Sequence, residues 1–291
     1  MTAGTGTTTA PAPSTVTVRR VSFPRVLASE WIKFRTLRST VWTAVITAVV
    51  MIGFALMMAS LMNMAASTPE MREGMASDPD MQAMGMTGTT VITLGYSFGQ
   101  LAIAVLGALI VTNEYSTGMI RSTFAAVPHR LPTLWAKLLV IVATTVVVIA
   151  LALGIAYLVT MPILDSAGLP VDLSDPTQLR SVGGCVLYLA TVAAFALAIG
   201  TLLRHSAGAI FTLVALFFVL PIIFSIVVGA TDAAWAEWVN KLLPSVAGER
   251  VIATGPTPDN LLEPWTGYAV LAGYTVALLA AAAVTLKRRD A

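Results

Sequence analysis

Six long apolar runs constrain the fold of this chain more than any other feature of its sequence. They cover approximately residues 41–62, 91–112, 134–161, 182–203, 207–229 and 267–286. A helix rises about 1.5 Å per residue, so a run of roughly 20 residues crosses about 30 Å of hydrocarbon. The composition, 57% hydrophobic and 11% charged, also lies outside the range of a soluble domain. We therefore predict an all-α membrane protein with six transmembrane helices in one bundle.

The segments that connect these runs carry opposite charges on alternate sides. Thirteen of the seventeen Lys and Arg residues precede the first run, lie around the second and fourth loops, or follow the last run. Twelve of the fifteen acidic residues lie in the other three loops. Because cationic loops resist translocation, the basic side is predicted to face the cytoplasm, with both termini there. The net charge of +2 is explained by insertion and lipid headgroups, and gives no indication of nucleic-acid binding.

The chain outside the predicted six-span domain (residues 41–286) is short. Residues 1–23 have too few large apolar residues to offset their ordering entropy, so a disordered cytoplasmic tail is expected. A second cytoplasmic tail is expected at 287–291. Residues 24–40 are predicted to form an amphipathic helix in the inner membrane interface. Its apolar stripe is expected to consist of Leu27, Trp31 and Phe34.

Two of the external loops have distinctive compositions. Residues 63–90 are rich in Met and acidic residues, and no role can be assigned to them from the sequence. The fifth loop, residues 230–266, places Trp235 and Trp238 at helical spacing before a Pro-rich stretch. Tryptophan prefers the headgroup region, so we predict a short helix that dips into the outer interface.

The residues needed for most kinds of catalysis are missing. None of the four lysines follows a glycine, which excludes the Gly-Lys ending of a phosphate-binding loop, so the chain is not expected to be an enzyme. Cys185 is the sole cysteine and is expected to be a small buried hydrophobe. His129 and His205 have no clustered carboxylate or thiol, so no metal site is predicted.

Residues 95–99 match the G-x-S-x-G nucleophile pattern, with Ser97 at its centre. That pattern needs a strained strand-to-helix turn and a nearby base, whereas this segment lies in a predicted span. Gly95 and Gly99 are better explained as small residues that let another helix approach closely.

Other polar or helix-breaking residues in the spans have two interpretations. Tyr96, Gln100 and Pro221 serve either helix packing or a substrate pathway, and packing is favoured. Lys137 lies near a cytoplasmic end, where its side chain can snorkel to the interface. No ionisable residue is predicted at mid-span, which argues against a proton-coupled transporter.

Three segments together resemble a known family. They are SEWIKFRTLRST before the first span, NEYSTGMIRSTFAAVPHR after the second, and LPSVAG after the fifth. From about residue 25 to 286, the chain is similar to the permease subunits of bacterial ABC exporters of the second type. The middle segment is the most specific of the three. The external loop at 63–90 is longer than the resemblance leads us to expect.

The resemblance implies a subunit that forms the substrate path as a dimer, either of identical chains or with a paralogue, in the bacterial plasma membrane. A separate ATP-binding subunit would use ATP and Mg²⁺, and this chain would bind no cofactor. Residues 24–40 would be the family's interfacial elbow helix, and the fifth loop its re-entrant external element. The segment 113–130 would supply the coupling helix that docks on the ATPase. The residues that match its motif are Glu114, Tyr115, Gly118, Ile120 and Arg121.

Three alternatives remain: an ion-coupled secondary transporter, an intramembrane serine hydrolase that uses Ser97, and a membrane anchor or sensor subunit. The sequence does not indicate the substrate, and only the resemblance indicates export. A charged Glu114 at the end of a span is costly unless paired, so we expect a partner, either Arg121 or a cation of the elbow helix.

Overall fold

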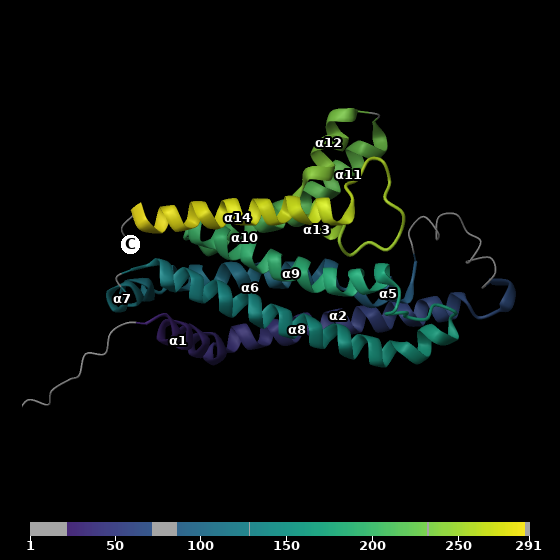
Figure 1. The fold of residues 1–291 in the computed structure, drawn as a ribbon, viewed down its shortest axis with the longest axis horizontal. Helices are drawn as coiled ribbons and strands as arrows, with labels where there is room; N and C mark the ends of the chain where they lie inside the picture. The colour runs from purple at the N-terminus through teal and green to yellow at the C-terminus, as the bar shows by residue number, and fades with distance from the viewer. Residues whose placement is uncertain (1–21, 72–85, 128, 232, 289–291) are drawn as a thin grey trace, which may run out of the picture.

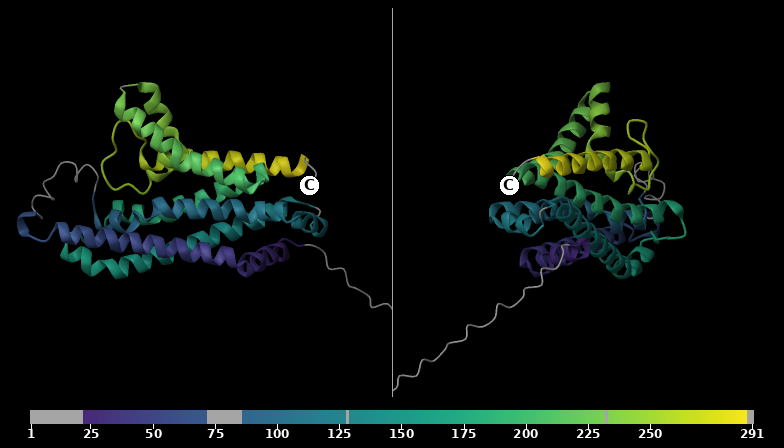
Figure 2. Two further views of the ribbon diagram at one scale, coloured as in Figure 1. Left: turned by 180° about the vertical axis from the view of Figure 1, so that it is seen from behind. Right: turned by 60° about the vertical axis from the view of Figure 1, so that its left-hand side comes forward.

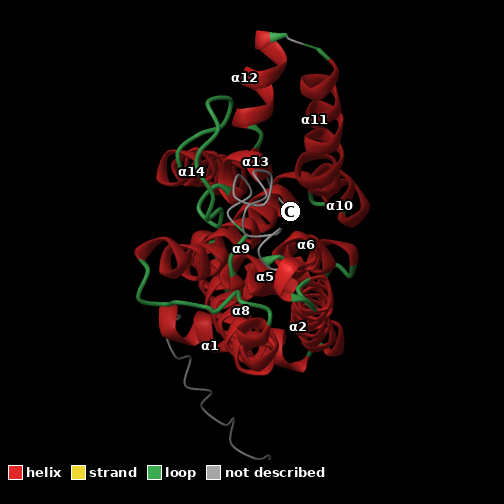
Figure 3. Cartoon of the chain, turned by 90° about the vertical axis from the view of Figure 1, so that its right-hand side faces the viewer, coloured by secondary structure: helices red, strands yellow, loops and turns green. Residues whose placement is uncertain are grey.

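The computed structural model describes residues 22–71, 86–127, 129–231 and 233–288 (Figure 1). Within these residues every regular element is a helix (Figure 3). Six helices are long and apolar enough to cross a membrane: Arg38–Ala65, Gly88–Ser116, Leu131–Ser166, Pro176–Leu203, Ser206–Ala230 and Pro264–Arg288. The predicted all-α fold with six spans is therefore confirmed.

Several predicted segments lie wholly or partly outside the described residues. This holds for the tail at 1–23 except its last two positions, for residues 72–85 of the first external loop, and for residues 289–291 of the C-terminal tail.

Shorter helices accompany the six spans. The elements in chain order are α1 (Phe23–Thr36), α2 (Arg38–Ala65), α5 (Gly88–Thr93), α6 (Tyr96–Ser116), α7 (Met119–Ala126), α8 (Leu131–Ser166), α9 (Pro176–Leu203), α10 (Ser206–Val214), the π-helical η1 (Ala215–Val219), α11 (Leu220–Ala230), α12 (Ala234–Leu242), α13 (Pro244–Glu249) and α14 (Pro264–Arg288). Helices α1 and α7 lie at one end of the bundle, here named the α7 end, with the last turns of α14 (Figure 1). Helices α5 and α13 lie at the opposite end, the α13 end.

Helix α9 is the centre of the bundle. In its apolar window 72% of the residues are buried, against 50% or less in each of the other five spans. It packs against α6, α8 and α14. Small residues bring α6 and α9 into backbone contact: a Cβ on Gly107 would lie 2.6 Å from the carbonyl oxygen of Ala193. Close approach through small residues is the usual basis of helix packing in membranes, where apolar surface alone provides little preference.

Helix α8 is longer than the sequence indicated. It continues through Pro162 to Ser166, so placing the end of the span before that proline was wrong. Proline removes one backbone donor but does not end a helix whose neighbouring residues are held by packing, and Leu164 is fully buried. Helix α9 then begins at Pro176, with the Asp175 side chain accepting a hydrogen bond from the Thr177 amide at 2.9 Å.

The fifth span changes from α-helix to π-helix halfway along its length. Pro221 lacks a backbone N–H, and the turn before it is π-helical, with the Leu220 N–H bonded to the Ala215 carbonyl oxygen. Beyond this point α11 leaves the bundle together with α12 (Figure 2), and none of its residues is buried within the chain.

The fifth loop contains a short helix, as the sequence predicted, followed by a second one. Trp235 and Trp238 on α12 are largely exposed, whereas α13 returns into the bundle. Gly248 of α13 packs between the side chains of Tyr188 and Leu271, and a Cβ there would overlap Leu271 Cδ2. The LPSVAG segment is thus packed between spans at the α13 end.

Replacing Gly107 tests the α6–α9 contact. We predict that Gly107→Ala lowers the free energy of unfolding by about 1–3 kcal/mol, because the added methyl group overlaps backbone atoms of α9. Gly154→Ala in α8 is the matched control, since a Cβ at that position would have no neighbouring atom within 4 Å. Thermal unfolding of both purified variants in detergent measures the effect. Equal stability of the two variants would contradict this packing.

Candidate functional site

Four charged side chains meet at the α7 end of the bundle. Lys137 Nζ of α8 lies 2.7 Å from Glu30 Oε2 of α1 and 2.6 Å from Glu114 Oε1 of α6. Lys33 Nζ of α1 lies 2.7 Å from Glu30 Oε1 and 2.9 Å from the same Glu114 oxygen. We name these four residues the charge cluster. It joins three helices through four ion pairs and carries no net charge.

The positions of the four residues follow from local structure. Glu30 and Lys33 are three residues apart on α1, so both lie on one face, and this face rests on the first turns of α8. Lys137 lies in the second turn of α8, and Glu114 in the last turn of α6. The short excursion through α7 brings those two helix ends side by side.

The charge cluster is largely hidden from solvent. The Glu30, Glu114 and Lys137 side chains are 2–4% exposed, and only Lys33, at 29%, reaches the surface. Burial lowers the pKa of Lys33, but its hydrogen bonds to Glu30 and Glu114 outweigh this, so the pKa is raised and the side chain stays charged. Removing charges from water costs several kcal/mol per ion, which only a complete set of partners offsets.

Two expectations from the sequence are settled by this geometry. Of the two partners expected for Glu114, the structure shows the cation of α1, Lys33. Arg121, the other candidate, is exposed and forms no ion pair within the described chain. The prediction that Lys137 snorkels outward was wrong. Its side chain turns inward because two carboxylates are within reach there.

Helix α7 is fastened to the charge cluster and to its neighbours. Gly118 adopts a left-handed φ of +72°, which allows the tight turn from α6 into α7. Lys33 Nζ also donates to Thr123 Oγ1 of α7 at 3.3 Å. Ile120 is buried, whereas Met119 and Arg121 on the other face are exposed. The helix therefore has one face held by the bundle and one face available to a partner.

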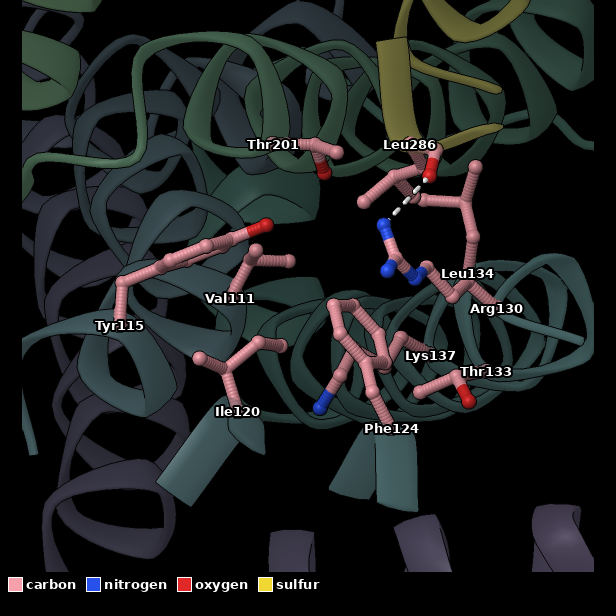
Figure 4. Close-up of a pocket in the computed structure, with 10 residues that line it drawn as sticks. All are labelled: Val111, Tyr115, Ile120, Phe124, Arg130, Thr133, Leu134, Lys137, Thr201 and Leu286. Carbon is pink, nitrogen blue, oxygen red and sulfur yellow. Dashed lines mark hydrogen bonds between the residues drawn. The ribbon is translucent and has the colours of Figure 1, made fainter. Parts of the chain in front are cut away.

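A cavity of about 20 Å³, enough for one water molecule, lies between α7 and the spans (Figure 4). Tyr115, Ile120 and Phe124 surround it, and the Tyr115 ring is covered by the guanidinium of Arg204 at 5.3 Å. Arg130 lies 5.1 Å from the Phe124 ring and donates to the Leu286 carbonyl oxygen at 3.3 Å. The segment after α7 is thus also tied to the end of α14.

The elbow stripe expected from the sequence is divided between two environments. Phe34 is 6% exposed and packs in the bundle, and Leu27 is partly buried beside it. Trp31 is 46% exposed, so only this residue points away from the protein. The three residues therefore do not form one outward-facing apolar stripe, because the face of α1 that carries Glu30 and Phe34 packs against the bundle.

The other predicted residues of the second span lie near the start of α6, toward the α13 end. Gly95 and Gly99 face α2, where a Cβ on Gly95 would lie 2.7 Å from Met51 Cα. Gln100 accepts a hydrogen bond from the Tyr188 hydroxyl, and the Tyr96 hydroxyl donates to Glu249 Oε2 at 3.0 Å.

Glu249 and Tyr188 were not identified from the sequence. One is an acid in an external loop and the other a tyrosine in an apolar run. No local pattern marks the hydrogen bond of Glu249 or the burial of Tyr188.

The geometry gives no support to a hydrolase that uses Ser97. Ser97 is near the start of α6, whereas His205 caps the start of α10. The Ser206 hydroxyl donates to Thr112 near the end of α6 at 3.0 Å, which places that histidine at the opposite end of the helix. His129 lies just before α8, at the α7 end, so neither histidine is beside Ser97.

The charge cluster yields a stability test. We predict that Lys137→Met lowers the free energy of unfolding by about 3–5 kcal/mol, because two buried carboxylates would share only Lys33. Lys287→Met, an exposed position, is the control. Adding Glu114→Gln to Lys137→Met removes one unpaired anion and should recover part of the loss in thermal unfolding assays. A double variant no more stable than Lys137→Met would contradict the ion-pair explanation.

Comparison with known proteins gives one family match. The model of the family described as ABC-2 family transporter protein matches residues 76–284, which include four of the six spans in full, most of the last one, α7 and α13. No match to a curated protein was found. The match covers more than two-thirds of the chain, and it includes two of the four residues of the charge cluster, so the chain belongs to the ABC-2 transporter family of membrane proteins.

Proposed function

We propose that this chain is the membrane-spanning permease subunit of an ATP-driven exporter, coupled to separate ATPase subunits. Membership of the ABC-2 transporter family supports an ABC permease role and a partnership with an ATP-binding subunit. The chain itself is then not an enzyme, and ATP and Mg²⁺ are used by the partner. The observation that carries the coupling part of the proposal is that Thr123 of α7 is hydrogen-bonded to Lys33 of the charge cluster, which in turn joins α1, α6 and α8.

The proposed coupling route begins on the exposed face of α7. Met119, Arg121 and Ser122 are exposed there, and the ATPase docks on them. A displacement of α7 passes into α6 through the short Gly118 turn and into α1 through Lys33 and Thr123. Because Glu114 and Lys137 are ion-paired across α6 and α8, these spans tilt together. A short helix tied this firmly transmits motion that a flexible loop would absorb.

The exporter works as a dimer in the bacterial plasma membrane, with the substrate path between the two copies. In this arrangement the α7 end faces the cytoplasm, in agreement with the basic residues around it. Both termini then lie on that side, consistent with the end of α14 lying at the α7 end (Figure 1). The α13 end faces outward, where the exposed tryptophans of α12 contact the lipid headgroups.

The main alternative is an ion-coupled carrier. The acids and bases of the charge cluster neutralise one another. They lie on α1 and at the ends of two spans, not along a continuous path. This arrangement suits a structural joint better than a proton relay.

Coupling is tested with variants on the exposed face of α7. We predict that Arg121→Ala and Met119→Ala reduce the stimulation of the partner ATPase severalfold without lowering the thermal stability of the permease. Arg35→Ala, an exposed cation on α1, is the matched control and should behave as wild type. Stimulation of ATPase activity in proteoliposomes containing both subunits is the readout. Wild-type stimulation in all three variants would remove α7 from the coupling route, and transport by the permease alone would contradict ATP-driven export.

Topology is tested by cysteine labelling in intact cells. In a Cys185→Ala background, Asp259→Cys should react with a membrane-impermeant maleimide, whereas Ser122→Cys should react only after permeabilisation. Both positions are exposed in the structure, so differences in reactivity report the side of the membrane. The reverse pattern would invert the topology.

A further inference from the structure

A second polar site lies at the α13 end of the bundle, far from the charge cluster. A cavity of about 210 Å³, open on one side, is bounded by α5, α6, α13 and the segment that follows α13. Its polar lining includes Tyr96, Glu249, Arg250 and the hydroxyls of Thr90 and Thr254, and its apolar lining includes Leu94 and Ile252. The cavity has room for several non-hydrogen atoms.

Glu249 is the distinctive residue of this cavity. Its Oε2 accepts the Tyr96 hydroxyl at 3.0 Å, while Oε1 accepts no hydrogen bond within the described chain. No Lys or Arg nitrogen of that same part of the chain lies within the ion-pair distance of 4.0 Å. Burial raises the pKa of Glu249 to about 7, and the Tyr96 hydrogen bond and the charge of Arg250 offset this only in part. At pH 8 the site therefore holds a half-buried carboxylate that has no cation within ion-pair distance in the described chain, which is a costly arrangement.

The neighbouring cations are directed elsewhere. Arg250 donates through Nε to the Leu262 carbonyl oxygen at 3.1 Å. Arg180 of α9 donates to the carbonyl oxygens of Val251 and Ala253 at 3.1 and 2.8 Å. The charge of Glu263, from the segment before α14, acts on both arginines. These groups hold the chain after α13 in place. Arg250 also lines the cavity and its charge acts on Glu249, but no ion pair within 4.0 Å joins the two residues.

The walls of the cavity are fixed. The Ser181 hydroxyl donates to the Ile252 carbonyl oxygen at 2.6 Å, and the Thr90 and Thr254 hydroxyls lie 2.8 Å apart across the cavity rim. Gly184 of α9 lets the Val251 carbonyl approach so closely that a Cβ would lie 2.6 Å away. The site is thus formed before any ligand arrives, which reduces the ordering cost of binding.

We propose that this cavity binds a small organic ammonium ion, with Glu249 as its counter-ion. The Glu249 carboxylate would pair with the positive charge of the ligand, and the Tyr96 ring would attract its alkylammonium group. Leu94 and Ile252 would contact the methyl groups of the ligand. A divalent metal ion is a poorer occupant, because Ca²⁺ takes six to eight oxygen ligands and this cavity offers a single carboxylate. This site is independent of the coupling route proposed above.

Binding is tested on the purified full-length chain in nanodiscs of phosphatidylglycerol, with choline as the probe. Choline should bind saturably by calorimetry at pH 8, and at least tenfold more weakly to Glu249→Gln. Asp259→Asn, which removes an exposed acid of the same loop, should bind as wild type. The neutral isostere 3,3-dimethylbutan-1-ol should not bind saturably. Lowering the pH to 5.5 protonates the carboxylate, so choline binding should weaken in the wild type.

A second variant distinguishes an effect of the Glu249 charge on binding from an effect of the substitution on folding. Tyr96→Phe keeps the carboxylate but removes the hydrogen bond that favours its ionised form, so the midpoint of the pH dependence should move upward. Replacing half of the lipid with phosphatidylcholine distinguishes a headgroup from a dissolved cation. If headgroups fill the site, thermal stability rises in wild type but not in Glu249→Gln. The proposal is overturned if neither choline nor phosphatidylcholine has an effect that depends on Glu249.

Discussion

The α7 end depends on one constraint: two carboxylates and the ammonium group of Lys137 are removed from water together, and Lys33 pairs with the same carboxylates from the surface. Each buried charge is tolerable only while its partners are present, so α1, α6 and α8 cannot separate without exposing or orphaning a charge. Apolar packing does not impose such a restriction inside a membrane, since a lipid tail replaces a leucine contact at little cost. The ion pairs are directional, and they define how the interfacial helix sits on the spans.

The other helices show what happens where that constraint is absent. Helix α9 is held by small residues that let neighbouring backbones approach closely, so its position depends on the fit between helix surfaces. Helix α11 has neither buried charges nor close backbone contacts, and it diverges from the bundle after the π-helical turn at Pro221 (Figure 2). The segment with the fewest internal contacts therefore has its apolar surface available for lipid or for a second subunit, as the proposed dimer requires.

The two ends of the bundle handle buried charge in opposite ways. At the α7 end each carboxylate is ion-paired with two ammonium groups within the chain, both through Oε1 in the case of Glu114, and we propose that the cluster serves as a joint. At the α13 end Glu249 is bonded to a neutral hydroxyl, and nearby arginines hold backbone carbonyls. In the proposals made above, the carboxylates with ion pairs transmit motion, whereas the carboxylate without an ion pair within the described chain has a place for a ligand.

The sequence by itself determined the features that depend on long apolar runs and on local patterns: six spans, an all-α fold, a short helix carrying Trp235 and Trp238, and the segment around Glu114 as the candidate for coupling. It did not determine which cation pairs with Glu114, why Lys137 turns inward, or that Glu30 is buried. It also did not reveal that Glu249 and Tyr96, 153 residues apart, share a hydrogen bond. Those outcomes depend on which helix faces meet, because the energy of a charge in a membrane protein is set by its neighbours in space. The local sequence does not specify those neighbours.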